Sequence, residues 1–129
     1  MLPREFEERL KIQLGDEFEA YLAAISEERY RALRVNTQKC SKEAFLEMNP
    51  WGIEAADKVE WCEDGYYYRK EDELSPGRHP YHAAGVYYIQ EPSAMSPVPY
   101  LDVRENMKVL DLCASPGGKT TQIASYMKQ

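Results

Sequence analysis

The sequence predicts an α/β protein in which a small mixed module leads into an alternating β-α unit. Two amphipathic helical patterns open the chain, and short β-prone runs separated by turns follow. Near the end, "KVLDLCASPGGKTTQIA" joins an apolar run to a helical pattern through a glycine turn. We therefore place an α/β module at residues 1–75, a connector with one strand at 76–104, and the start of a second domain at 105–129.

Composition limits the class of protein. The chain has 129 residues, of which 43% are hydrophobic, enough for one compact domain or one domain plus part of a second. It contains no apolar run of membrane-spanning length and no signal-like N-terminus, so we expect no membrane association and a cytoplasmic location. Cys40, Cys62 and Cys113 have neither disulfide nor zinc spacing and are expected to be reduced. The net charge of −6 argues against a free-standing nucleic-acid binder but leaves room for a local basic face.

The first two helices are expected to form a hairpin. Pro3 suits the first position of a helix that ends before Gly15. Asp16 is expected to cap a second helix, whose apolar side chains from Phe18 to Ile25 share one face.

The next segments alternate between strand and helix patterns. Residues 29–37 are predicted to form a strand that ends in a turn. Ser41 is a candidate N-cap for a helix over residues 44–48, which Pro50 terminates. Residues 58–70 are expected to form a β-hairpin with a tight primed turn at Asp64-Gly65.

The second half of the chain is rich in proline and glycine. Residues 75–85 are expected to connect to a strand over 86–90, followed by a turn or short helix at Pro92 and a Pro-broken linker. A strand over 108–114 and a helix from Lys119 to the C-terminus complete the prediction.

The glycine turn does not fit the common nucleotide-binding loops. A Walker loop would need glycine where Cys113 stands, and Pro116 removes one N–H donor from the curve. A dinucleotide fingerprint needs three spaced glycines, whereas Gly117 and Gly118 are adjacent and no third follows. What remains is a helix N-terminus that can face a carboxylate or phosphate, or a turn with no ligand.

The residues around this turn carry a family resemblance. "DLCASPGGKTTQIA" closely resembles the first cofactor motif of the Sun/NOP (RsmB/RsmF-like) family of RNA cytosine-5 methyltransferases, which bind S-adenosylmethionine. "GVYYIQEPSAM" and "LRVNT" resemble two upstream blocks of that family, in the same order. "LPREFEERL" resembles the start of RsmF-type members, which act on small-subunit ribosomal RNA. The resemblance implies that the second domain is the beginning of a Rossmann-like class I methyltransferase domain.

The resemblance also implies a cofactor loop. It assigns the methionine end of S-adenosylmethionine to Cys113, Ala114, Ser115, Pro116, Gly117, Gly118 and Lys119, with Lys119 near the carboxylate. Asp111 is expected to orient this loop or to receive the cofactor amine; the alternative is a cap for the turn. Cys113 is expected to be a small buried residue and not a nucleophile.

The family's catalytic cysteines lie in downstream Pro-Cys-Ser-like and Thr-Cys-Ser-like motifs that this sequence lacks. We therefore expect an N-terminal part of a longer enzyme, inactive by itself and with weak or no cofactor binding. It is expected to dimerise through open strand edges or to pack residues 105–129 against the first module. The alternative is a stand-alone RNA-binding or interaction module, and a nucleotide hydrolase is a distant third.

Arginines provide the candidate RNA contacts. Arg29 and Arg31 are expected to share one face of a strand, either toward RNA phosphates or as charges that protect an edge strand. By resemblance, Arg34 and Asn36 face RNA or bridge two domains. The tyrosines of "GYYYR" and "VYYIQ" could stack on bases, but packing is the favoured role.

Gln90 and Glu91 are placed by the resemblance near the cofactor and target base; their alternative role is to cap the following turn. His79 and His82 lack further ligands nearby and are not expected to bind a metal.

Overall fold

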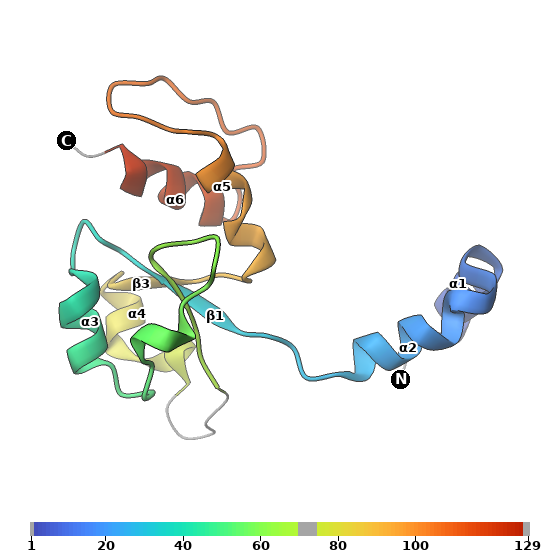
Figure 1. The fold of residues 1–129 in the computed structure, drawn as a ribbon. Coiled ribbons are helices and arrows are strands. Elements are labelled where there is room, and N and C mark those ends of the chain that lie inside the picture. The colour runs from blue at the N-terminus through green and yellow to red at the C-terminus, as the bar shows by residue number, and fades with distance from the viewer. Residues whose placement is uncertain (1, 70–74, 128–129) are drawn as a thin grey trace.

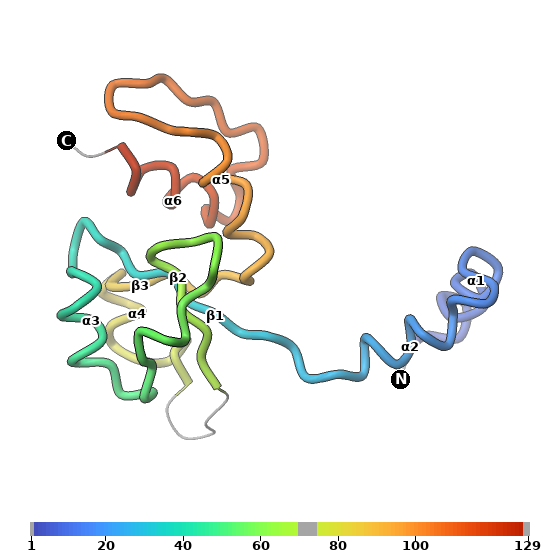
Figure 2. Tube along the Cα trace, in the orientation of Figure 1, coloured from blue at the N-terminus to red at the C-terminus, as the bar shows by residue number. Residues whose placement is uncertain are grey.

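A computed structural model describes residues 2–69 and 75–127 of the protein (Figure 1). The described strands form a three-stranded antiparallel sheet in the order β2-β1-β3, made of β1 (Ala32–Val35), β2 (Gly65–Tyr67) and β3 (Tyr87–Ile89). Leu33 of the central strand lies opposite Tyr66 on one side and Ile89 on the other. The helical hairpin stands apart from this sheet, whereas α6 (Gly118–Tyr126) lies against the body (Figures 1 and 2).

The hairpin consists of α1 (Arg4–Leu14) and α2 (Phe18–Ser26), joined by the short 3-10 helix η1 (Gly15–Glu17). The predicted pair of helices is confirmed, with Pro3 as the N-cap of α1. The prediction that Asp16 caps α2 is wrong. Because η1 runs directly into α2, the N-cap is Glu17 in a helical conformation, without a side-chain hydrogen bond.

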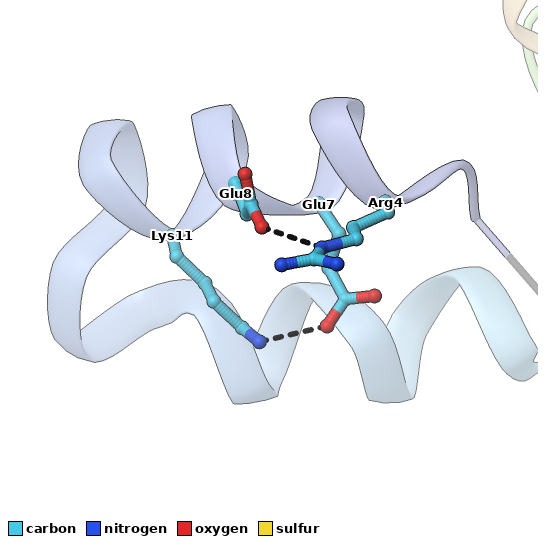
Figure 3. A network of polar contacts seen from close by, with 4 residues as sticks. All are labelled: Arg4, Glu7, Glu8 and Lys11. Atoms are coloured by element: carbon cyan, nitrogen blue, oxygen red, sulfur yellow. Dashed lines mark hydrogen bonds and ion pairs between the residues drawn. The ribbon is translucent and has the colours of Figure 1, made fainter.

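Exposed ion pairs lie along α1 (Figure 3). Arg4 Nε lies 2.9 Å from Glu8 Oε1, and Lys11 Nζ lies 2.7 Å from Glu7 Oε1. Solvent screens pairs of this kind, one turn apart on an exposed helix, so they contribute little to stability. Packing around Phe18, which is buried beneath Lys11, is the stronger link between the two helices.

The sheet is buried on both faces. One face carries an aliphatic and aromatic cluster of Leu33, Val35, Phe45, Trp51, Ile53, Tyr66 and Tyr87. Helix α3 (Lys42–Met48) inserts Phe45 into this cluster, and the predicted N-cap is confirmed, since the Ser41 side chain accepts a hydrogen bond from Ala44 N–H. The second cluster contains Ala32, Val59, Cys62 and Met95.

The predicted hairpin over residues 58–70 is wrong. Only β2 is a strand, and its partner is β1; Lys58 meets Tyr66 at a single isolated bridge. The 3-10 helix η2 (Ala55–Asp57) precedes this bridge, and Gly65 has no left-handed backbone. The intervening chain instead turns inward, which places Val59 and Cys62 in the second cluster. Lys70 lies outside the described residues.

The predicted connector is structured. It contains the 3-10 helix η3 (Pro76–Arg78) and helix α4 (Pro80–Ala83), followed by the expected strand β3. The 3-10 helix η4 (Ser93–Met95) and helix α5 (Pro97–Tyr100) come next. Since β3 pairs with β1, the predicted boundary at residue 75 is not a break in the sheet.

The final helix is confirmed over its described length, but the predicted strand over residues 108–114 is wrong. A parallel strand needs a neighbour to accept its backbone hydrogen bonds, and no described strand lies beside this segment. Leu110 and Leu112 are 80% and 85% exposed as a result. The expected Rossmann-like arrangement is therefore not formed by the described residues, and no described helix is long and apolar enough to span a membrane.

Candidate functional site

The loop before α6 is organised by the side chain of Asp111. Its Oδ1 accepts a hydrogen bond of 2.9 Å from Cys113 N–H, and its Oδ2 accepts one of 2.6 Å from the Thr120 hydroxyl. These bonds connect the start of the loop to the first turn of the helix. The Thr120 hydroxyl is the main cause that lowers the pKa of Asp111, and Cys113 N–H and the Lys119 charge act in the same direction. These contacts fit both a role in orienting the loop and the alternative in which Asp111 caps the turn.

The two glycines of the turn differ in what they require. Gly117 is the N-cap of α6 and has φ +115°, in the left-handed region that favours glycine. At Gly118 a Cβ atom would lie 3.4 Å from Gln90 Cδ and 3.5 Å from Tyr88 Cε1, which are ordinary contact distances. Gly117 thus permits the sharp turn, and the neighbours of Gly118 show that α6 starts close to β3 and Gln90.

The turn presents hydrogen-bond donors on its open side. The first turn of a helix leaves N–H groups without intrahelical partners, together with a partial positive charge. The exposed side chain of Lys119 adds a full positive charge at the same place. Within the loop, Pro116 has no N–H and that of Cys113 is already bound to Asp111. The donors available to an anion are therefore concentrated toward the helix.

Cys113 is exposed, so the expectation that it is buried is wrong. It was predicted to end a buried strand, and that strand is not formed.

Arg34 lies beneath the turn and is only 3% exposed. Its Nε donates to Gln90 Oε1 at 3.1 Å, and its Nη2 donates to Thr121 Oγ1 at 2.7 Å and to Gly118 O at 3.3 Å. Burial lowers the pKa of this guanidinium, which remains a cation in proteins. Of the two expected roles, the contacts match a bridge between sheet and helix and not an RNA-facing side chain.

Gln90 continues this buried polar network. Its Nε2 donates to Ala94 O at 3.0 Å and lies 3.3 Å from Gln122 Oε1. Gln122 Nε2 donates in turn to Met95 O at 2.8 Å. The bond to Ala94 agrees with the alternative in which Gln90 holds the following turn. The side chain of Glu91 is exposed.

Sequence reasoning missed Thr121 and Gln122. A polar side chain in the middle of a short helix carries no local signal of a distant buried partner. The one available signal is that Gln122 falls beside Ile123, on the face of α6 that packs against the body.

The candidate RNA-contact residues divide into exposed side chains and side chains that make hydrogen bonds within the protein. Arg29 and Arg31 are exposed, but they precede β1, so their predicted placement on one strand face is wrong. They line a cleft of about 1060 Å³ together with Arg69 and the aromatic residues Tyr30, Trp51, Tyr67 and Tyr68; Glu28, Glu54 and Asp57 also line it. Asn36 donates to Gly85 O at 2.8 Å and so joins the end of β1 to the turn before β3.

His79 has a structural role, since its Nδ1 accepts a hydrogen bond from Tyr81 N–H at the start of α4. Among the described residues, no group of three potential ligands is placed to hold a metal ion.

The fold is similar to that of a methyltransferase homolog of known structure. The chain is similar to a crystal structure of a methyltransferase homolog from Pyrococcus horikoshii, with a TM-score of 0.73 and 32% identity, over 98% of this chain and 41% of that one. Residues 2–92 match the N-terminal domain of the 16S rRNA methyltransferase RsmF, and the chain belongs to this family.

Curated relatives agree with the family assignment. Ribosomal RNA small subunit methyltransferase F from Enterobacter sp. (strain 638) is 42% identical over 115 residues, and the protein of the same name from Escherichia fergusonii is 41% identical. Each match covers 85% of this chain and 24% of the relative. The chain thus spans about a quarter of the length of these proteins.

Proposed function

We propose that this chain is the N-terminal part of an S-adenosylmethionine-dependent methyltransferase that modifies carbon-5 of a cytosine in small-subunit ribosomal RNA, in the cytoplasm. The match of residues 2–92 to the RsmF N-terminal domain is the observation that carries this proposal. The small sheet would support RNA binding, and residues 105–129 would contribute the first cofactor loop of the catalytic domain.

The donor set of this loop fits the methionine end of the cofactor, which supplies the methyl group when bound. A carboxylate suits the N–H groups at the start of α6 and the ammonium group of Lys119. Residues 113–119 would wrap around this end. Asp111 would keep the loop in place, and its remaining lone pairs could receive the cofactor amine. Gln90 would support the loop from below, and the exposed Glu91 would lie nearer the target base.

The cleft beside β2 is the proposed RNA contact. Arg29 and Arg31 are positioned to bind phosphates, while Tyr30 is 82% exposed and its ring centroid lies 5.9 Å from that of Tyr67. Exposed aromatic rings next to arginines are typical of surfaces that bind unpaired nucleotides. Asn36 would act indirectly, by holding the end of β1.

Isothermal titration of the full-length protein with S-adenosylmethionine and with ATP tests the cofactor assignment. We expect binding of S-adenosylmethionine and none of ATP. Lys119→Gln should weaken binding about tenfold, the amount typical of one lost hydrogen bond to a charged group. Tight ATP binding would overturn the assignment.

The alternative is an RNA-binding module whose glycine turn serves packing alone, and the arginine-lined cleft is the observation that favours it. On that account the chain by itself binds RNA with a strong salt dependence. Gly117→Ala would then affect only the stability of the chain and not its binding of RNA.

A further inference from the structure

Arg34 is a buried cation whose hydrogen bonds all go to neutral groups: an amide oxygen, a backbone carbonyl and a hydroxyl. Taking a charge out of water is costly, and a well-packed apolar side chain often replaces a buried ionic group without loss of stability. Burial of the side chain therefore gives no reason for an arginine here. The role of Arg34 must therefore come from the groups that accept hydrogen bonds from its guanidinium.

The guanidinium holds the first turn of α6. Two of its three acceptors, Gly118 O and Thr121 Oγ1, belong to that turn. The Thr121 hydroxyl donates in turn to Gly117 O at 2.8 Å. A continuous path of hydrogen bonds thus leads from the central strand to the left-handed residue at the end of the loop.

The opposite side of the loop offers little support. Apart from Gly117 and its two chain neighbours, no heavy atom lies within 4 Å of the position where a Cβ of Gly117 would be. The two hydrogen bonds of Asp111 go to Cys113 in the loop and to Thr120 on α6, so they do not attach the loop to the sheet. Besides the Arg34 path, Tyr88 OH donates to Pro116 O at 3.3 Å, the same length as the Arg34 bond to Gly118 O. Side chains of the sheet, Arg34 on β1 and Tyr88 on β3, therefore hold the loop and the first turn of α6 in position.

We infer that Arg34 is a positioning residue, which fixes the first turn of α6 and thereby the loop of residues 113–119. The effect on cofactor affinity rests on the proposed function, whereas the effect on the loop itself does not. Lysine cannot replace arginine in this role, because a single ammonium lacks the planar fork that reaches Gln90 and Thr121 together.

The test uses the full-length protein and its Arg34→Gln, Arg34→Lys and Arg78→Gln variants. Arg78 is exposed on η3 and serves as the matched control for the loss of one charge. We expect Arg34→Gln to bind S-adenosylhomocysteine about tenfold more weakly, at a temperature where circular dichroism shows it fully folded. Amide hydrogen exchange over residues 111–121 should be faster in this variant, and Arg78→Gln should match the wild type in both measurements.

Arg34→Lys should resemble Arg34→Gln in cofactor affinity and in hydrogen exchange. Wild-type values for Arg34→Lys would overturn the role assigned to the planar guanidinium. If Arg34→Gln does not fold, Thr121→Val removes the hydroxyl at nearly constant size and should also speed exchange in the loop. If folded variants of both Arg34 and Thr121 exchange the loop amides at the wild-type rate, the inference is wrong. A wild-type protein that binds no cofactor would instead contradict the proposed function, and the exchange measurement would still decide the role of Arg34.

Discussion

At the residue scale, Asp111 shows how a partly exposed carboxylate can organise a loop. Its two oxygens bind a backbone N–H within the loop and a hydroxyl on the helix. Both donors favour the charged form, so the pKa of the carboxyl lies below its ordinary value. A lowered pKa means that these bonds hold the loop at neutral pH and weaken only as the pH falls through the lowered value.

Replacement of Thr120 by valine should raise the pKa of Asp111 toward its ordinary value of 3.8, because the Thr120 hydroxyl is the largest cause of the shift. The carbon-13 resonance of the carboxyl, followed by NMR as a function of pH, measures this change. Thr37→Val, at a position outside the loop, is the matched control for the loss of a threonine hydroxyl. Equal pKa values in the wild type and Thr120→Val would show that the hydroxyl does not hold the carboxylate.

Part of the site could be predicted from these residues and part could not. The glycine pair, Lys119 and Asp111 are adjacent in the sequence, so their spacing alone indicates a loop before a helix. Arg34 and Gln122 lie far apart in the sequence and are connected through Gln90. No local sequence pattern indicates which buried polar groups will contact one another, so this network could be found only from the structure.

At the element scale, local signals predicted the elements that form from local interactions. The helices that begin at Arg4, Lys42 and Gly118 follow from apolar spacing, a serine cap and a glycine turn. The prediction for residues 58–70 failed because the β-prone first run packs into a core and does not pair. Residues 108–114 have a strand sequence, but no described strand lies beside them to pair with.

The start of β2 depends on the absence of a side chain at Gly65. A Cβ atom there would lie 2.7 Å from Met95 Sδ and 3.1 Å from Cys62 Cβ. Gly65→Ala should therefore lower the free energy of unfolding by about 1–3 kcal/mol, the usual cost of overpacking. Urea denaturation followed by circular dichroism measures this change in the free energy of unfolding.

Gly77→Ala is the control for this substitution, because its nearest neighbour would be Ile89 Cδ1 at an ordinary 3.6 Å. We expect it to change the free energy of unfolding by less than about 0.5 kcal/mol. Equal effects of the two substitutions would contradict the account of crowding at Gly65.

At the scale of the whole molecule, an apolar surface remains open next to the loop. Met107, Leu110 and Leu112 are 43%, 80% and 85% exposed. Exposed apolar side chains close together in the sequence favour association. Because the predicted strand is not formed, any dimer would use these side chains and not the backbone edge of that strand.

The 129-residue chain should consequently associate as its concentration rises, and Leu110→Ser combined with Leu112→Ser should prevent this. Sedimentation velocity over a range of concentrations measures the change. Replacement of Ile12 by serine is the control for the loss of apolar surface elsewhere, because Ile12 lies on α1 and is 85% exposed. A chain that stays monomeric at all concentrations would rule out this surface as a contact.

The proposed activity connects the arginine-lined cleft, the glycine turn and the buried network in a single enzyme. Methyl transfer measured with labelled S-adenosylmethionine, the full-length protein and 16S ribosomal RNA tests this most directly. We predict label on carbon-5 of a cytosine in the RNA. Unlabelled RNA, obtained with folded protein and intact cofactor, would contradict the account.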